Sequence, residues 1–337
     1  MRYLVILTVG AIGACSSLFA AEPSAVPVPP PITAQAPADL PGRGLAQHPF
    51  FYAGEDKIQR MVIVRDGAIA WSHTMPDSKG EISDAMLRPN GHILFAHQFG
   101  VTEIDADKHV VWHLDAPTGC EIHTAQALGD DQVMYVQNGD PALLKVVSKS
   151  SGATILSLTL PVKNPKNVHG HFRHARMTAA GTFLVAHMDL KMVSEYDRAG
   201  KTIWTIALDS TPWSAARLAN GDTLIALTRN QVIEVDHDGK TVWEFSQADV
   251  PAYRMSSTQL ATRLANGNTL INLWFNPWSG KVDFANAPVQ ALEVTPAKQV
   301  VWALRSWQPP CDLGPATTIQ LLDEPANVED SAVSITP

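Results

Sequence analysis

The sequence predicts an all-β protein, a six-bladed β-propeller of four-stranded blades whose ring is closed by pairing N- and C-terminal strands. Three observations support this prediction: short apolar runs separated by turn signals, a tryptophan that recurs once per unit, and an incomplete unit at each end of the chain. The clearest unit is residues 212–245, PWSAARLANGDTLIALTRNQVIEVDHDGKTVWEF. Its Asn220-Gly221 and Asp238-Gly239 pairs predict tight hairpins in which both central residues take positive φ.

The same four-strand unit recurs along the chain. A four-stranded sheet that is apolar on both faces is not stable alone, so it needs neighbouring copies. The fourth strand carries a marker at Trp71, Trp112, Leu156, Trp204, Trp243 and Trp302. The intervals between these markers are typical of propeller blades, and six markers predict six blades.

The ends of the chain explain how the ring closes. The runs FFYAG and MVIVRDG precede Trp71, but the first unit lacks its innermost strand. The run PATTIQLLDEP follows the last tryptophan and has no strands after it. We therefore expect residues 317–322 to pair beside the N-terminal runs, because closure removes the exposed edges of an open array.

The N-terminal residues have the composition of an export signal. Residues 1–21 contain one arginine, an apolar run and then small residues, as in a secretory signal peptide. Ile12-Gly13-Ala14-Cys15 resembles a bacterial lipobox, in which Cys15 becomes the lipidated N-terminus. Cleavage near Ala20 is the alternative. We expect the protein in the periplasm, either soluble or anchored to the outer membrane through this lipid.

Composition divides the rest of the chain. Residues 22–44 are rich in proline and alanine and predict an extended linker. Residues 45–325 are expected to form the propeller, and residues 326–337 a disordered tail. A net charge of -8 without a basic block argues against nucleic-acid binding. We expect a monomer that contacts membrane only through the lipid.

Two cysteines remain beyond Cys15. Cys120 and Cys311 precede the inner strands of blades that are not neighbours. An exported protein can pair such cysteines, so a disulfide between them stays open.

The predicted loops differ between the two faces of the ring. One face carries tight Asn-Gly and Asp-Gly hairpins, whereas the other carries longer loops such as residues 161–176 and 246–259. Binding sites usually lie on variable loops held by a rigid scaffold, so we assign function to the second face. The candidate catalytic residues there are His123, His171 and His174. The candidate ligand-binding residues are Arg173, Arg176, Trp213, Arg217, Arg254, Gln259, Arg263 and Trp274.

These residue types suit an anionic or carbohydrate-like ligand. Arginine offers a planar fork to carboxylate or sulfate, tryptophan stacks on sugar or aryl rings, and histidine moves protons near neutral pH. Strand alternation predicts that His171 and Arg173 lie on one side of their strand, with His169, and that His174 and Arg176 lie on the other.

A metal site is a further possibility. His169-x-His171 with His123 or His187 could hold zinc or another divalent ion. Because this spacing is common by chance, we assign no metal ligand from the sequence.

The units resemble a known repeat. The segments LANGDTLIAL and LANGNTLINL, with the endings GKTIW and GKTVWEF, resemble the pyrroloquinoline-quinone-type propeller repeat. That resemblance implies that the outer-strand tryptophan docks adjacent blades. Quinoprotein dehydrogenases of this type usually have more blades and, in the alcohol-oxidising branch, vicinal cysteines over the cofactor. This chain has six predicted blades and no vicinal pair, so the cofactor is left unknown and pyrroloquinoline quinone is not expected.

The turns at Asn90-Gly91, Asn220-Gly221 and Asn266-Gly267 and the histidines of the channel mouth resemble those of arylsulfotransferase-like propellers. These are six-bladed and periplasmic, and a central histidine takes the sulfuryl group. Three functions therefore stay open: binding of a small ligand at one channel mouth; an enzyme, acting as sulfotransferase, lyase or hydrolase, that uses the same histidines and arginines; and a periplasmic assembly scaffold.

Overall fold

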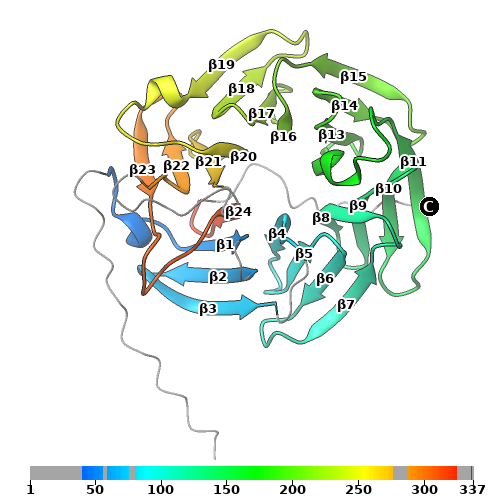
Figure 1. Cartoon of the computed structure of the whole chain (residues 1–337), viewed down its shortest axis with the longest axis horizontal. Coiled ribbons are helices and arrows are strands. Elements are labelled where there is room, and N and C mark those ends of the chain that lie inside the picture. Colours follow the sequence, from blue (N-terminus) through cyan, green and yellow to red (C-terminus); the bar gives the residue numbers. More distant parts are fainter. Residues whose placement is uncertain (1–39, 56–58, 76–79, 276–286, 325–334, 336–337) are drawn as a thin grey trace, which may run out of the picture. The chain divides into compact units, whose positions relative to one another are not determined.

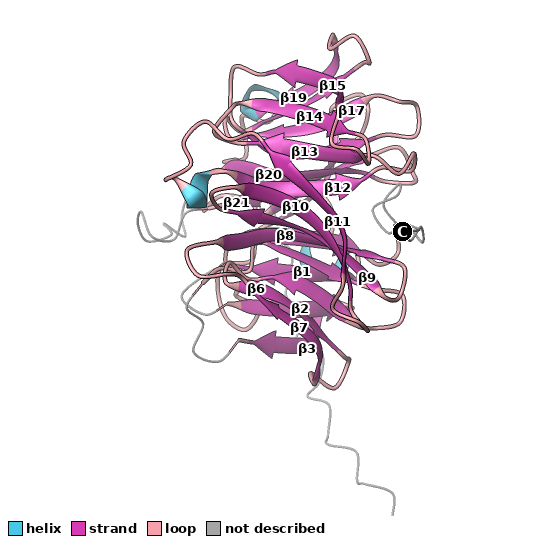
Figure 2. Cartoon of the chain, turned by 90° about the vertical axis from the view of Figure 1, so that its right-hand side faces the viewer, coloured by secondary structure: helices cyan, strands magenta, loops and turns pink. Residues whose placement is uncertain are grey.

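The computed structural model describes residues 40–55, 59–75, 80–275, 287–324 and 335. These residues form six four-stranded antiparallel sheets that are arranged radially as blades (Figure 1). Seen from the side, the strands run between two faces that carry the loops (Figure 2). The predicted six-bladed propeller is therefore confirmed. The predicted signal peptide and Cys15 lie outside the described residues.

The blades follow the chain, and the strands within each blade are ordered from the channel outward. Blade A comprises β24 (Ala316–Leu321), β1 (Phe50–Gly54), β2 (Arg60–Arg65) and β3 (Ala68–Thr74). Blade B comprises β4 (Asp84–Leu87), β5 (Ile93–Ala96), β6 (Gly100–Ile104) and β7 (Val110–Asp115). Blade C comprises β8 (Glu121–Leu128), β9 (Gln132–Asn138), β10 (Ala142–Ser148) and β11 (Thr154–Leu160).

The other three blades have the same order. Blade D comprises β12 (Phe172–Met177), β13 (Phe183–His187), β14 (Met192–Tyr196) and β15 (Thr202–Ala207). Blade E comprises β16 (Pro212–Arg217), β17 (Thr223–Leu227), β18 (Gln231–Val235) and β19 (Thr241–Ser246). Blade F comprises β20 (Ser257–Arg263), β21 (Thr269–Trp274), β22 (Ala291–Val294) and β23 (Val300–Leu304). Three short 3-10 helices are η1 (Gly44–Ala46), η2 (Val168–Gly170) and η3 (Gln247–Asp249).

Blade A closes the ring as predicted. Strand β24 pairs antiparallel with β1, with Gln320 opposite Phe51 and Ile319 opposite Tyr52. The side chains of Phe50 and Tyr52 are buried in one apolar cluster with Trp302 of blade F. Blade A therefore joins its neighbour through core packing as well as through its own strand pairing.

The outer-strand tryptophans dock neighbouring blades, as the repeat resemblance implies. The Trp71 indole Nε1 donates to the Ala106 carbonyl oxygen of blade B at 2.9 Å. The equivalent bonds run from Trp204 to His237 at 2.7 Å, from Trp243 to Pro296 at 3.0 Å and from Trp302 to Gly44 at 2.8 Å. Each of these rings therefore covers the junction with the next blade.

The inner hairpins differ in one detail from the prediction. At Asn220-Gly221 only the glycine takes positive φ, of 92°, and its N–H donates to the Leu218 carbonyl oxygen at 3.0 Å. The Leu218 N–H donates in turn to the Asp222 carbonyl oxygen at 2.8 Å. This is the longer loop in which an ordinary turn is followed by one left-handed residue. The prediction of positive φ at both central residues is wrong at this hairpin.

Segments at both ends of the described chain pack on blades. Residues 40–44 were assigned to the linker, but Leu40 is buried in the core of blades E and F. The Pro41 carbonyl oxygen also accepts a hydrogen bond from the Ala303 N–H at 3.2 Å. In the predicted tail, Ile335 is buried, and its backbone forms two hydrogen bonds with the Gln132 side chain, at 2.7 and 2.8 Å.

Two further features concern the environment of the protein. Cys120 and Cys311, which precede the inner strands of the non-adjacent blades C and A, are both free thiols in the structure. Within the described ranges, no helix has the length and apolar character needed to cross a bilayer.

Candidate functional site

Two cavities lie along the central channel. The loop-side cavity has a volume of about 190 Å³ and lies where the inner strands begin. The hairpin-side cavity has a volume of about 350 Å³ and lies where they end. The loop-side cavity is lined by Glu55, Glu81, Ser83, His169, Arg173, His174, Trp213, Gln259, Leu260, Trp274 and Thr317. It lies on the face to which the sequence assigned function.

A buried ion pair and Leu260 lie between the two cavities. Both terminal nitrogens of the Arg176 guanidinium, Nη1 and Nη2, donate to the Asp84 carboxylate, each at 2.8 Å. Thr124 Oγ1 donates to the same carboxylate at 2.8 Å. Burial raises the pKa of Asp84, but the Arg176 charge outweighs this effect and the pKa is lowered. Arg176 lines the hairpin-side cavity and Leu260 lines both cavities.

Irregular pairing of the inner strands positions the cavity lining. Five of the six inner strands contain a β-bulge near their start; the inner strand of blade B pairs regularly. The extra residues at four of these bulges are Thr317, Arg173, Trp213 and Gln259, and all four line the loop-side cavity. A bulge breaks alternation and turns a side chain toward a new direction. The fifth bulge, in β8, includes His123.

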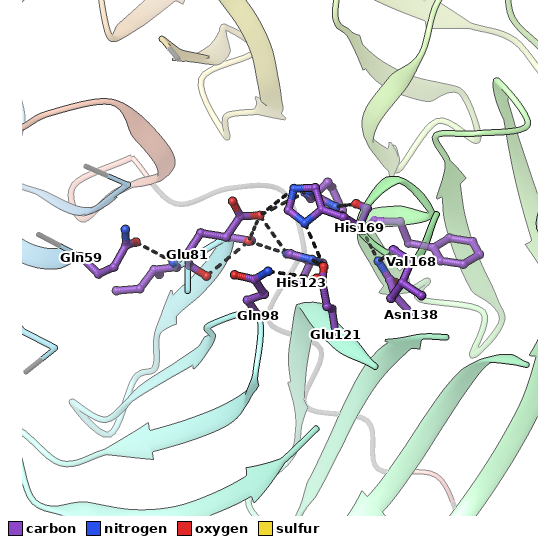
Figure 3. Close-up of polar contacts among 12 residues, drawn as sticks. Gln59, Glu81, Gln98, Glu121, His123, Asn138, Val168 and His169 are labelled. Carbon is purple, nitrogen blue, oxygen red and sulfur yellow. Dashed lines mark hydrogen bonds and ion pairs between the residues drawn. The ribbon is translucent and has the colours of Figure 1, made fainter. Parts of the chain in front are cut away.

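A polar cluster lies beside the loop-side cavity (Figure 3). His123 is buried between two carboxylates, with Nε2 at 2.7 Å from Glu121 Oε2 and Nδ1 at 3.1 Å from Glu81 Oε1. His169 is half exposed, and its Nδ1 lies 2.9 Å from the same Glu121 oxygen. Gln98 Nε2 donates to the other Glu121 oxygen at 3.0 Å. Strand β8, the loop before β4 and helix η2 thus converge on one point.

Arg173 adds the positive charge of this cluster. Its Nη2 lies 2.7 Å from His169 Nε2 and 3.3 Å from Glu81 Oε1. Burial raises the pKa of Glu81, but the hydrogen bond from His123 and the Arg173 charge lower it to about 2. The pKa of Glu121 is lowered in the same way, because hydrogen bonds from His123 and His169 outweigh its burial. Both carboxylates are therefore ionised at neutral pH.

Aromatic side chains form another wall of the cavity. The rings of Trp213 and Trp274 lie 6.1 Å apart at an angle of 50°. The Arg173 guanidinium lies 5.6 Å from the Trp213 ring. Within the part of the chain that the structure describes, both indole Nε1 atoms are shielded from solvent and have no hydrogen-bond partner.

The structure brings together six of the predicted site residues. Arg173, His174, Trp213, Gln259 and Trp274 line the loop-side cavity, and His123 contacts Glu81 in its wall. His171 is buried elsewhere, with Nε2 at 2.9 Å from the Asn164 carbonyl oxygen. The prediction that Arg173 and His174 lie on opposite sides of their strand is wrong, because the bulge at Arg173 interrupts the alternation.

Two other predicted site residues, Arg217 and Arg263, each contact a glutamate and a tryptophan of the preceding blade. We call each such set of contacts an interblade clasp. Arg217 Nη2 lies 2.6 Å from Glu195 Oε2, and its guanidinium lies 4.6 Å from the Trp204 ring, both on the preceding blade. Arg263 makes the same contacts: its Nη2 lies 2.6 Å from Glu234 Oε2, and its guanidinium lies 5.6 Å from the Trp243 ring. Neither arginine lines the loop-side or the hairpin-side cavity. Arg254 is exposed and lies 6.0 Å from the Phe275 ring.

Several residues of the site were missed by the sequence analysis. Glu121 lies two residues before His123, so strand alternation could have placed it on the same side. Glu55 and Glu81 follow strands in short loops, where no periodic pattern gives a direction. The contacts between these carboxylates and the histidines are therefore known only from the structure.

The sequence also matches a propeller family model. The model described as outer membrane protein assembly factor BamB, one of the pyrroloquinoline-quinone repeat models, matches residues 142–283. Residues 142–283 therefore carry pyrroloquinoline-quinone-type propeller repeats. No curated protein matches this propeller in sequence.

Solved structures support the fold of this repeat protein. A protein of unknown function from Bacteroides caccae is 23% identical, with a TM-score of 0.68, and the match covers 81% of this chain and 98% of that one. A streptogramin B lyase is 10% identical, with a TM-score of 0.53 and coverage of 80% and 87%. An inactive virginiamycin B lyase from Staphylococcus aureus, solved with quinupristin, is 13% identical, with a TM-score of 0.50 and coverage of 71% and 74%. At these identities the likeness concerns the fold alone.

Proposed function

We propose that this repeat protein is exported and binds a small hydroxylated, carbohydrate-like ligand in the loop-side cavity. The observation that carries the proposal is the pair of shielded indole N–H groups, of Trp213 and Trp274, that lack an acceptor in the described chain. A buried donor without an acceptor is costly, at about 1–3 kcal/mol. A ligand oxygen in the cavity would remove that cost once a small rotation of the rings turned these N–H groups toward it.

The rest of the lining fits the same ligand class. The indole rings offer stacking surfaces to the apolar face of a sugar ring. The Glu55 and Glu81 carboxylates accept hydrogen bonds from hydroxyl groups, and the Gln259 amide can both donate and accept. The volume of about 190 Å³ suits a small ligand rather than a drug-sized one.

The charges favour a hydroxylated ligand over a strongly anionic one. Arg173 lies against Glu81, and the charges of Glu121 and Glu55 also act on it. A ligand carboxylate or sulfate would have to compete with these side chains for the guanidinium. A neutral sugar can accept from the indole N–H groups without disturbing that pairing.

Conservative tryptophan substitutions test this proposal. Trp213→Phe and Trp274→Phe keep an aromatic surface but remove the indole N–H. Each should weaken binding of the best ligand from a panel of neutral saccharides, uronic-acid oligosaccharides and aryl sulfates about fivefold, as expected for one lost hydrogen bond. Isothermal titration calorimetry measures the affinity, and Trp112→Phe on the outer strand of blade B is the matched control.

The panel separates the ligand classes. Binding of neutral saccharides supports the proposal, whereas tight binding of aryl sulfates or uronic acids alone would replace it with the anionic alternative. If no member of the panel shifts the melting temperature, the proposal fails.

An enzyme acting in the same cavity is a second candidate. One observation favours it: His169 is 53% exposed beside the cavity, and its Nδ1 is held by Glu121 at 2.9 Å. An imidazole oriented by a carboxylate is the arrangement of a general base. Turnover of any panel member, lost in His169→Gln, would establish catalysis, and binding without turnover would exclude it for that panel.

The family model raises the assembly-scaffold alternative. A scaffold that acts through its rim should keep its function when the cavity is altered. His169→Gln combined with Arg173→Met should leave such a function intact, whereas both cavity hypotheses predict its loss without unfolding.

A further inference from the structure

Three side chains of the polar cluster present donor atoms to one point. Glu81 lies in the loop before β4, His123 in β8 and His169 in η2, and one donor atom from each lies within 4.8 Å of the others. Two imidazoles and a carboxylate are a ligand set of zinc sites that keep an open position. The sequence spacing suggested His169 and His171 with His123 or His187, and the structure instead groups His169 and His123 with Glu81.

Glu121 fixes which nitrogens face that point (Figure 3). One Glu121 oxygen lies 2.7 Å from His123 Nε2 and 2.9 Å from His169 Nδ1. The opposite nitrogens, His123 Nδ1 and His169 Nε2, lie 3.1 and 4.0 Å from Glu81 Oε1. Metal-binding histidines usually donate their far N–H to a carboxylate, which fixes the tautomer and the ring orientation. In this cluster one carboxylate does so for both rings.

The charges around this point favour a cation. Glu55 and Glu81 line the cavity and Glu121 lies beside them, so three carboxylates face the single guanidinium of Arg173. That guanidinium lies 2.7 Å from His169 Nε2. Because arginine can only donate, this nitrogen carries a lone pair rather than a proton. The cluster therefore presents a neutral imidazole nitrogen to a positive group.

We infer that Glu81, His123 and His169 bind a divalent metal ion of the zinc class, in exchange for the Arg173 guanidinium. Arg173 Nη2 already contacts two of the three ligand residues, Glu81 at 3.3 Å and His169 at 2.7 Å, so it holds positive charge where the ion would bind. Ligands of tetrahedral zinc lie roughly 3.3 Å apart. The 3.1 Å pair meets this distance, and the half-exposed His169 closes the 4.0 Å pair by a small shift.

The fourth position of the ion faces the loop-side cavity. His169, Glu81 and Arg173 all line that cavity, so water or a ligand oxygen can reach the ion from it. On leaving, the guanidinium can stay against the Trp213 ring, from which it is 5.6 Å distant. The metal site does not depend on the proposed saccharide, since its ligands all belong to the protein.

Zinc titration of the metal-free, untagged protein tests the inference. Calorimetry should show one bound Zn²⁺, and the same protein with Co²⁺ should show the visible absorption of a tetrahedral site. Glu81→Gln and His169→Gln should each abolish this binding. Glu121→Gln should weaken it about 10- to 100-fold, as expected for a residue that only orients the ligands. Arg173→Met should tighten it, because the competing guanidinium is gone.

A matched control and a folding check make the result decisive. His109→Gln removes a 75% exposed histidine that pairs with Asp105 on a turn of blade B, and it should leave zinc binding unchanged. Circular dichroism confirms that each variant is folded. Equal zinc binding by the unmodified protein and His169→Gln would overturn the inference, as would absence of zinc binding in both the unmodified protein and Arg173→Met.

Discussion

The two mouths of the channel are built from opposite ends of the same inner strands, and they differ in pairing as well as in composition. At the loop-side mouth, four inner strands each turn a bulged residue into the cavity. At the hairpin-side mouth the strands pair regularly, and Leu264, Leu270 and Ile319 are among the lining residues. The difference shows that bulges turn side chains able to form hydrogen bonds into one mouth, whereas regular pairing lines the other mouth with several apolar side chains.

Volume alone would have identified the hairpin-side mouth as the binding site. The hairpin-side cavity is almost twice as large, and two of its polar side chains bond within the protein, although Arg88 Nε has no partner in the described chain. Arg88 Nη1 donates to Glu103 at 2.7 Å, and Gln320 bonds the Leu87 backbone N–H and carbonyl oxygen. The loop-side cavity instead holds indole N–H groups that lack a partner in the described chain. The loop-side cavity is therefore distinguished by its two indole donors and not by its volume.

The largest expected effect comes from breaking the ion pair that lies between the two mouths. Asp84→Asn leaves the Arg176 guanidinium buried without a carboxylate, and we expect a loss of about 3–5 kcal/mol in the free energy of unfolding. Urea unfolding followed by circular dichroism measures it. Combining the change with Arg176→Met should recover part of the loss. Equal stability of Asp84→Asn and the unmodified protein would show that the pair does not hold the blades together.

The next effect separates clasp arginines from the cavity arginine. Arg217→Met leaves Glu195 without its cation and should lower stability by about 2 kcal/mol, since hydrogen bonds to charged groups contribute about that much. It should leave saccharide affinity unchanged, because Arg217 lies outside the loop-side cavity. Arg173→Met, in contrast, should change affinity. Thermal unfolding measures the stability of both variants, and calorimetry measures their saccharide affinity. Altered saccharide affinity in Arg217→Met would show that Arg217 takes part in binding.

A smaller effect tests the independence of the two mouths. Leu87→Ser at the hairpin-side mouth should cost about 1 kcal/mol, because a half-buried apolar side chain is lost. Saccharide affinity should change less than about twofold, since the Asp84–Arg176 pair separates the cavities. Trp213→Phe should have the opposite profile, with saccharide affinity weakened about fivefold. A large affinity change in Leu87→Ser would mean that the cavities communicate.

The smallest effect depends on pH and concerns His48, whose ring lies 3.0 Å from Glu293 of blade F and 3.1 Å from Asp323, which follows β24. Burial lowers the pKa of His48, but hydrogen bonds to Glu293 and Asp323 outweigh it and the pKa is raised. A raised pKa means that this stabilisation is fully present below the ordinary value of about 6.5 and is lost as the pH rises through the folded-state value. We expect the free energy of unfolding of the unmodified protein to fall between about pH 6 and about pH 8.5. In His48→Gln this fall should be smaller, by at most about 1 kcal/mol.

The sequence was sufficient for the architecture because each signal there is local. The glycine of Asn220-Gly221 and the outer-strand Trp243 report on their own turn and blade junction, so repeated copies predict the blade count. The direction of Arg173, Trp213 and Gln259 depends on how each inner strand pairs with its neighbour. A bulge is a property of that pairing, and no pattern in a single strand reveals it. Glu81 lies in a loop, where no strand alternation gives the direction of a side chain, so its contact with His123 could not be predicted from the sequence.

The closure of blade A has a consequence for synthesis in the cell. Ala53 and Thr317 bond across 264 residues, so β1 leaves the ribosome long before the strand that covers its edge exists. Until then, the nascent chain carries an unprotected β-edge of buried aromatic residues, Phe50, Phe51 and Tyr52. A truncated product ending before Ala316 would keep that edge permanently, and self-association through it is the expected fate of such fragments.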